Sequence, residues 1–137
     1  MNNQGNINLP ITYDKLTVGY EFPRADYDMS LAVVSKYLEG VGIKGSQVEG
    51  FVPPLALAAR TIAAMSEFLI FPAGVIHASQ DLEFHKMVPV GAKIICHSKV
   101  TGKMDRGKMH LLTIEFAVYD QDSDKVQSGK STLVVSD

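Results

Sequence analysis

The chain has 137 residues, of which 46% are hydrophobic and 20% are charged, and its formal net charge is −2. This balance predicts one soluble globular domain and argues against wholesale disorder. The small negative charge and the lack of a basic run argue against nucleic acid or a membrane surface as partner. The start, MNNQGNINLP, has no apolar signal region, and Arg60 and Glu67 interrupt the longest apolar stretch. We therefore expect a cytoplasmic protein. Cys96 is the only cysteine, which excludes an intramolecular disulfide.

The first third of the chain predicts a leader, an edge strand, a short helix and a loop. Residues 1–10 are rich in Asn and end in Pro, which predicts a loose leader, and a turn at 17–20 follows. Phe22–Pro23 opens an edge-like strand that runs to about Met29. Ser30 is then the expected N-cap of a helix ending at Gly40, whose apolar positions recur at helical spacing: Leu31, Val34, Tyr37 and Leu38. The segment 40–50, GVGIKGSQVEG, carries four glycines and predicts a loop of the kind that often binds ligands.

A second, much more apolar helix is predicted from Pro53–Pro54 to about Leu69. Proline suits the first turn of a helix, where its missing N–H costs little. Beyond it, nearly every face of the helix is apolar, so the helix must be surrounded by protein. Arg60 and Glu67 are seven residues apart and share one narrow stripe. That stripe is where the helix meets solvent, a partner subunit or a ligand.

Four β-rich runs follow, and the period of hydrophobicity changes from helical to two. They cover residues 75–87, 93–103, 107–120 and 126–135. Gln80 falls on the apolar side of the first run. A hairpin turn at 104–107 ends in Gly107, where a positive φ is expected, and a further turn covers 120–125. Helix followed by strands predicts an α+β domain with an antiparallel meander against the buried helix.

The order of elements, and several phrases, resemble the hotdog superfamily, in which a curled sheet wraps a central helix. LTVGYEFP resembles the opening of MaoC-like hydratases, and FHKMVPVGAKI resembles their strand–turn phrase before a glycine. PAGVIHASQDLEFHKMVPVGAKI and the earlier FVPP are similar to phrases of fatty-acid-synthase-type dehydratase domains. The resemblance covers about residues 12–135. It implies a single hotdog domain over 1–137 and, as activity, hydration or dehydration of an acyl thioester.

The chain departs from the catalytic members of that family at the decisive place. Their Asp-x4-His pair, which holds the reacting water, would fall near Val41 and Ser46, and neither side chain is a base. PPLALA replaces their "HG" phrase at the start of the central helix. The resemblance therefore implies a half-module whose catalytic Asp and His come from a partner.

The start of the apolar helix is the expected binding site for the substrate. Helix N-termini favour developing negative charge, so the backbone around Pro54, Leu55 and Ala56 is placed against a thioester carbonyl. Gln80 and Phe84, on the strand after the helix, are expected to complete this binding surface. The alternative is an ordinary buried helix start whose N–H groups are satisfied by neighbouring carbonyls.

Two side chains are candidates for catalysis by this chain itself. Histidine is a residue type that suits acid–base chemistry near neutral pH, which makes His77 a candidate, although no carboxylate is placed in sequence to orient it. The alternative is an exposed or interface histidine. Some hotdog thioesterases use a helix carboxylate, so Glu67 is the second candidate if burial raises its pKa. The alternative is an ion-paired or surface glutamate beside Arg60. His85 is expected to pack near the turn, His97 to lie at the surface and His110 to take a satisfied core or interface position.

The leading hypothesis is a MaoC-like subunit of a hydro-lyase that binds acyl-CoA or acyl-carrier-protein thioesters. It would work as a homodimer or as a heterodimer with a dyad-bearing hotdog subunit. The second hypothesis is a hotdog acyl-CoA thioesterase that uses Glu67 or His77. The third is a non-catalytic acyl-binding subunit. The histidines lack metal-ligand spacing and the chain has no dinucleotide or phosphate-loop motif, so neither metal nor cofactor is expected.

Overall fold

The computed structural model describes residues 10–43 and 50–136, which form two α-helices and two sheets. In chain order the elements are β1 (Ile11–Thr12), the short 3-10 helix η2 (Tyr13–Lys15), β2 (Ala25–Asp28), α1 (Leu31–Gly40), α2 (Pro54–Ser66), β3 (Leu69–Ile70), β4 (Ile76–Phe84), β5 (Lys93–Arg106), β6 (Met109–Tyr119) and β7 (Lys125–Ser136). Among these described residues, no helix is long and apolar enough to cross a membrane.

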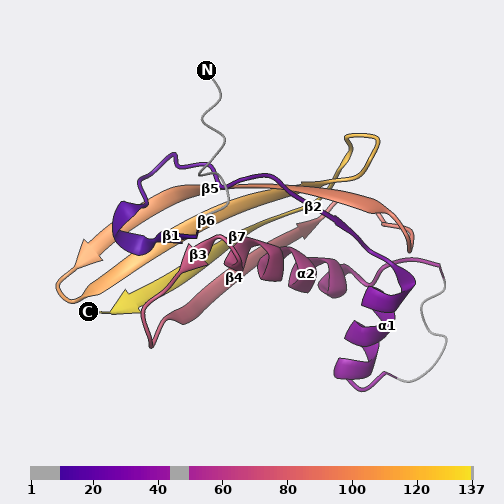
Figure 1. Ribbon diagram of the computed structural model, residues 1–137, viewed down its shortest axis with the longest axis horizontal. Helices are drawn as coiled ribbons and strands as arrows, with labels where there is room; N and C mark the ends of the chain where they lie inside the picture. The colour runs from indigo at the N-terminus through magenta and orange to yellow at the C-terminus, as the bar shows by residue number, and fades with distance from the viewer. Residues whose placement is uncertain (1–9, 44–49, 137) are drawn as a thin grey trace.

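The large sheet and α2 make two layers (Figure 1). Within the described residues the sheet has the strand order β2-β5-β6-β7-β4, and every pairing in it is antiparallel. The helix α2 lies along one face of this sheet, while α1 projects beyond its end (Figure 1). The short strands β1 and β3 pair in parallel at the other end of α2. Sequence periodicity did not predict either of them, because two residues are too few to show a period.

The predicted meander holds for three of the four strands and is wrong for the first. β4 does not pair with β5: it lies at the edge of the sheet beside β7, with Phe84 opposite Gln127. The connection over residues 85–92 therefore passes across the ends of β7 and β6. Three strand spacings are about 14 Å, and eight extended residues reach about 26 Å. The connection is long enough for this crossing, and hydrophobic periodicity carries no information on which strands are neighbours.

Most helix ends lie where the sequence predicts them. The Ser30 side chain accepts a hydrogen bond from the Val33 N–H at 3.2 Å, which caps α1, and this helix ends at Gly40 as expected. Pro54 is the first residue of α2. That helix ends at Ser66 rather than near Leu69, which instead belongs to β3. Gly107 turns the β5–β6 hairpin with a φ of +61°, the conformation expected for glycine there.

The chain buries only one side of α2. The side against the sheet is buried and consists of Ala56, Leu57, Ala58, Thr61, Ala64 and Met65. On the other side Leu55 is 57% exposed, and Ala59 and Ala63 are exposed as well. A helix that is apolar on nearly all sides is thus only half covered by the described residues of its own domain.

A polar contact joins the buried side of α2 to the edge strand β2. The Thr61 hydroxyl donates to the Leu57 carbonyl at 2.9 Å, so the buried Tyr27 hydroxyl is left to donate to the Thr61 oxygen. Burial raises the pKa of Tyr27 well above its ordinary value, which keeps this phenol protonated. The Arg60 guanidinium lies 5.0 Å from the centre of the Tyr27 ring, a cation–π distance.

The face of the sheet that turns away from α2 carries a row of alternating charges. Cross-strand neighbours in this row are, in order, Glu21, Lys99, Glu115, Lys130 and Asp81. Opposite charges on adjacent strands are favourable, and Lys130 lies 3.9 Å from Asp81. A face built in this way suits water, whereas α2 lies on the opposite face and carries the exposed Leu55.

Gly129 tests the packing inside the sheet. A Cβ at this position would lie 2.5 Å from the Phe116 ring and 2.7 Å from the Asp81 carbonyl oxygen. We expect Gly129→Ala to lower the free energy of unfolding by about 1–3 kcal/mol, because a buried ring and a strand backbone would have to move. Chemical denaturation measures this change. Gly40→Ala, where a Cβ meets nothing within 4 Å, is the control and should change stability little. Equal stability of the Gly129 variant and the wild type would contradict this packing.

Candidate functional site

The start of α2 offers few backbone donors. Pro53 and Pro54 have no N–H, and no side chain caps the helix. The Ala56 and Leu57 N–H groups both donate to the Pro53 carbonyl, at 2.9 and 3.3 Å. Within residues 10–43 and 50–136, the Leu55 N–H has no hydrogen-bond partner. Of the three residues predicted to face the thioester, Leu55 is therefore the one that presents a free backbone donor.

Backbone hydrogen bonds fix the chain on both sides of this helix start. The Val52 N–H donates to the Val88 carbonyl at 2.7 Å, and the Val90 N–H donates to the Gly50 carbonyl at 2.9 Å. The loop after β4 is thereby paired with the segment before α2. The same loop continues into Gly91, whose N–H donates to the Met29 carbonyl at 2.7 Å, next to the cap of α1. The FHKMVPVG phrase thus holds the helix start in place.

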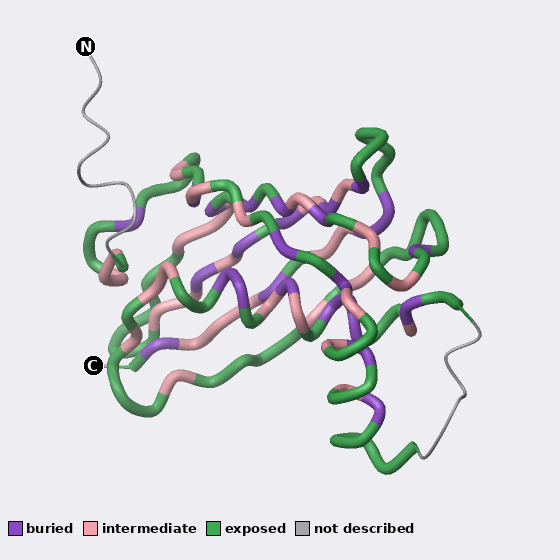
Figure 2. Tube along the Cα trace, turned by 45° about the vertical axis from the view of Figure 1, so that its right-hand side comes forward, coloured by how far each residue is buried: buried purple, intermediate pink, exposed green. Residues whose placement is uncertain are grey.

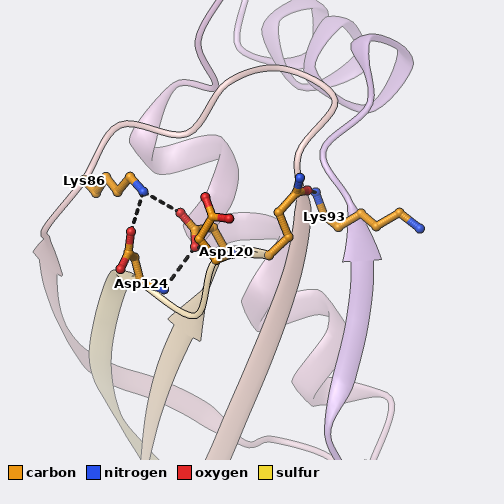
Figure 3. Close-up of polar contacts among 6 residues, drawn as sticks. Lys86, Lys93, Asp120 and Asp124 are labelled. Atoms are coloured by element: carbon orange, nitrogen blue, oxygen red, sulfur yellow. Dashed lines mark hydrogen bonds and ion pairs between the residues drawn. The ribbon is translucent and has the colours of Figure 1, made fainter.

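Lys86 anchors this loop to the turn between β6 and β7 (Figure 3). Its ammonium donates to Asp120 at 2.7 Å and to Asp124 at 2.8 Å. The other oxygen of Asp120 accepts the backbone N–H groups of Asp122 and Asp124, both at 3.0 Å. The hydrogen bond from Lys86 is the main reason that the pKa of Asp120 lies below its ordinary value. The hydrogen bonds to Asp120 and Asp124 raise the pKa of the Lys86 ammonium.

Gln127 on β7 is a site residue that the sequence prediction missed. Its side chain is fully buried, and its Nε2 donates to the Pro54 carbonyl at 3.2 Å. Its Oε1 is buried and has no partner among the described residues. On the neighbouring strand it stands opposite Phe84, which is 49% exposed. A signal existed, because Gln127 shares the inward parity of Leu133 and Val135 along the last strand.

Exposed apolar side chains surround the same helix start. They are Phe51, Leu55, Phe84 and Met87, with exposed fractions of 43%, 57%, 49% and 66%. Phe84 adjoins Gln127 across the strand pair, and Phe51 pairs with Pro89 in an isolated bridge. We call this set the apolar rim. It suits a long aliphatic ligand better than a charged one.

The predicted residues His77 and Gln80 do come together, with Ser131 of β7. His77 Nε2 lies 3.0 Å from Gln80 Oε1, and the Ser131 hydroxyl donates to the same oxygen. An amide oxygen only accepts, so the His77 Nε2 carries a proton here. Because the serine hydroxyl is directed at Gln80 instead of His77, this cluster does not activate the serine as a nucleophile.

Glu67 is exposed at the C-terminal end of α2, so it is not the buried carboxylate that the thioesterase hypothesis requires. In the described part of the chain, no hydrogen bond or ion pair joins Glu67 to His77 or to Arg60. Arg60 lies over the Tyr27 ring instead. The two candidate catalytic residues therefore do not form one site.

The remaining histidines have structural contacts. His85 lies 3.0 Å from the Ser128 hydroxyl, and the exposed His97 packs edge-on against Tyr119. His110 lies 2.6 Å from Asp105, in keeping with a satisfied position. Val41, where the family's aspartate would stand, is exposed at the end of α1, and Ser46 lies outside the described residues.

Two hollows lie elsewhere on the described surface. One is on the charged outer face of the sheet, around Lys99, Glu115 and Lys130. The other is at the opposite end of α2 from the apolar rim, between Phe71 and His110. At the start of α2 the rim residues Leu55, Phe84 and Met87 are open to solvent, so a ligand there would be enclosed only by a further surface.

This architecture, an antiparallel sheet packed on one central helix, is the hotdog fold of the α+β class. The MaoC-like dehydratase from Rhodospirillum rubrum has a TM-score of 0.72 at 18% identity, covering 92% of this chain and 97% of its own. The (R)-hydratase PhaJ1 from Pseudomonas aeruginosa has a TM-score of 0.74 at 18% identity, covering 95% and 87%. The HadBC (3R-hydroxyacyl-ACP dehydratase) complex from Mycobacterium tuberculosis matches with a TM-score of 0.67 at 14% identity, covering 84% and 93%. At these identities the likeness establishes the fold alone.

The family of the chain is established by its sequence. Residues 36–136 match the family described as the MFE-2 hydratase 2 N-terminal domain, and the chain belongs to that family. No relative was found among curated protein sequences. The match covers α2, the apolar rim and every strand of the large sheet except β2.

The anchor at Lys86 predicts a pH-dependent contribution to stability. An aspartate whose folded pKa is lowered stabilises the fold above its unfolded pKa of about 3.9, and this stabilisation is lost as the pH falls through the folded value. We expect Asp120→Asn to destabilise the protein by about 1–2 kcal/mol at pH 7. The difference should shrink below about pH 4.

Denaturation of both proteins between pH 2.5 and 7 measures this difference. Asp122→Asn is the matched control, since the Asp122 carboxylate is exposed and only its backbone N–H contacts Asp120. A destabilisation by Asp120→Asn that stays constant across this range would contradict the role of the carboxylate charge.

Proposed function

We propose that this chain is one half of an acyl-thioester hydratase or dehydratase site, and that a partner hotdog subunit supplies the catalytic Asp and His. The chain contributes the start of α2, with the Leu55 N–H against the thioester carbonyl, and the apolar rim along the acyl chain. The substrate is an acyl-CoA or an acyl-carrier-protein thioester. The observation that carries the proposal is the uncovered apolar side of α2 beside an open sheet edge.

That edge is β4. It is the outermost strand of the sheet beyond β7, so its outer backbone groups have no partner strand among the described residues. Seven of its nine residues are exposed, including Ile76 at 60% and Phe84 at 49% (Figure 2). A long exposed edge of this kind is a template for pairing with another chain. A second hotdog that extends the sheet at β4 would also cover the exposed side of α2, because α2 and β4 lie next to each other through Gln127.

The side chains at the start of α2 favour a binding half of a shared site over a complete enzyme. Hydration of an enoyl thioester needs a base that takes a proton from the attacking water. It also needs an acid that protonates the carbanion formed when the water adds. At the start of α2 the described side chains are apolar, apart from Gln127, and the two prolines have removed donors that an oxyanion site uses. The family is named for the N-terminal domain of a hydratase, and HadBC is a dehydratase complex by its name. Both names fit a hotdog that works beside another.

The second candidate, a thioesterase, has weaker support. One of its two candidate residues, Glu67, is exposed at the C-terminal end of α2, far along the helix from the apolar rim. His77 is protonated on the nitrogen that faces Gln80. A binding subunit without catalysis remains the third candidate, and it shares the same surface as the first.

The test is an enoyl-CoA hydration assay on the purified chain, alone and with a MaoC-like subunit that carries the Asp-x4-His pair. The chain alone should be inactive, and the mixture should be active in proportion to complex formed. In that complex Leu55→Lys should raise the KM for long acyl chains by about tenfold or more, because a charged side chain replaces apolar contact area. Glu67→Gln should leave activity unchanged. Appreciable hydration by the chain alone, or thioester cleavage that Glu67→Gln abolishes, would overturn the proposal.

A further inference from the structure

The fully buried Gln127 side chain is an exception to the usual rule for polar groups. Its Nε2 has a partner, the Pro54 carbonyl, but its Oε1 has none among the described residues. A buried acceptor without a donor costs free energy, and a hydrophobic residue of the same size would avoid that cost. Packing alone therefore does not account for an amide at this position. The one contact of the Gln127 amide, with the Pro54 carbonyl, indicates what this side chain does.

That contact orients a peptide unit. The Pro54 carbonyl and the Leu55 N–H belong to the same peptide group, and the chain has no cis peptide among the described residues. In a planar trans peptide the C=O and the N–H point in opposite directions. Because this peptide lies in the first turn of α2, its carbonyl points along the helix and the Leu55 N–H points back towards the start of the helix. The contact from Gln127 ties this first turn to β7 and so fixes where the Leu55 N–H lies.

We propose that Gln127 is a positioning residue for ligand binding: its amide holds the Pro54–Leu55 peptide so that the Leu55 N–H faces the carbonyl of a bound acyl thioester. This inference rests on the proposed function and extends it to a residue on a different element. Two independent features meet at this spot, an unpartnered donor at a helix start and an unpartnered buried acceptor next to it. A helix start preceded by two prolines has one free donor to orient, so the direction of that donor decides how well the carbonyl is bound.

Two properties should separate in the variant Gln127→Met. Methionine has a similar volume and no polar group, so the orphaned acceptor disappears and the melting temperature of the ligand-free chain should stay equal or rise. Binding of the thioester should nevertheless weaken by about tenfold, which corresponds to about one hydrogen bond. A residue that only supports the fold would show the reverse, with a lower melting temperature and unchanged affinity.

The experiment is a titration with a saturated acyl-CoA, followed through the amide resonance of Leu55. The full chain, labelled with ¹⁵N, is used in complex with an unlabelled MaoC-like subunit that carries the Asp-x4-His pair. In the wild type this resonance should shift downfield as its N–H becomes a donor, and free CoA should not produce the shift. In Gln127→Met the shift should be lost or should need about ten times more ligand. Gln121→Met makes the same chemical change on the exposed β6–β7 turn and should behave as the wild type.

The outcomes distinguish this inference from the proposed function. An equal Leu55 shift in the wild type and in Gln127→Met would overturn the role of Gln127 while leaving the proposed site intact. A wild type in which acyl-CoA shifts other resonances but not Leu55 would overturn the inference and move the thioester elsewhere. A wild type that does not respond to acyl-CoA at all would count against both.

A second variant keeps the test decisive if Gln127→Met does not fold. In Gln127→Glu the protonated acid can donate to the Pro54 carbonyl, and the ionised form cannot. Burial favours the neutral acid, so this form persists to a higher pH than in water. Acyl-CoA affinity of the variant should approach that of the wild type at low pH and fall as the pH rises. An affinity that does not change with pH relative to the wild type would overturn the inference.

Discussion

The structure depends on a helix that is more apolar than its own chain can cover. The sheet buries the side of α2 that carries Leu57, Thr61 and Met65, while Leu55, Ala59 and Ala63 remain exposed. Hydrophobic burial is the dominant favourable term in folding and in association. The uncovered side of α2, together with the open edge of β4, is therefore the surface on which the proposed second subunit would dock. Each functional conclusion above follows from that half-covered helix.

Polar contacts then give the apolar helix a fixed position and direction. Tyr27 and Thr61 join its middle to β2, and Gln127 joins its first turn to β7. The loop after β4 is paired with the segment before the helix, and Lys86 holds that loop against Asp120. Hydrophobic contact is non-directional, whereas these hydrogen bonds have direction. They are what place one backbone N–H, that of Leu55, at the apolar rim.

Sequence reasoning succeeded where local chemistry decides the structure. The Ser30 cap, the end of α1 at Gly40 and the two prolines at the start of α2 are all fixed by residues within a few positions of one another. It failed where distant segments decide. Nothing in the alternation of residues 75–87 shows that β4 pairs with β7, because alternation gives the face of a strand and not its neighbour.

In the candidate site, too, local features were predicted and contacts between distant segments were not. Of the expected surface, Pro54 and Phe84 are linked through Gln127, which contacts the Pro54 carbonyl and stands opposite Phe84. Gln80 instead contacts His77 and Ser131. Gln127 was missed because its role depends on a contact 73 residues away along the chain. For Glu67, helical spacing gives a stripe shared with Arg60 without saying whether that stripe is buried; the exposed position after the end of the helix agrees with the surface alternative.

The central claim is that an acyl thioester binds at the start of α2. The most direct measurement is photo-crosslinking with an acyl-CoA that carries a photoreactive group on its acyl chain, followed by mapping of the labelled peptides by mass spectrometry. Labelling should fall on the segments that contain Phe51, Leu55, Phe84 and Met87, and an excess of unlabelled acyl-CoA should prevent it. Labelling concentrated instead around Tyr13 and Phe71, at the opposite end of α2, would contradict the account.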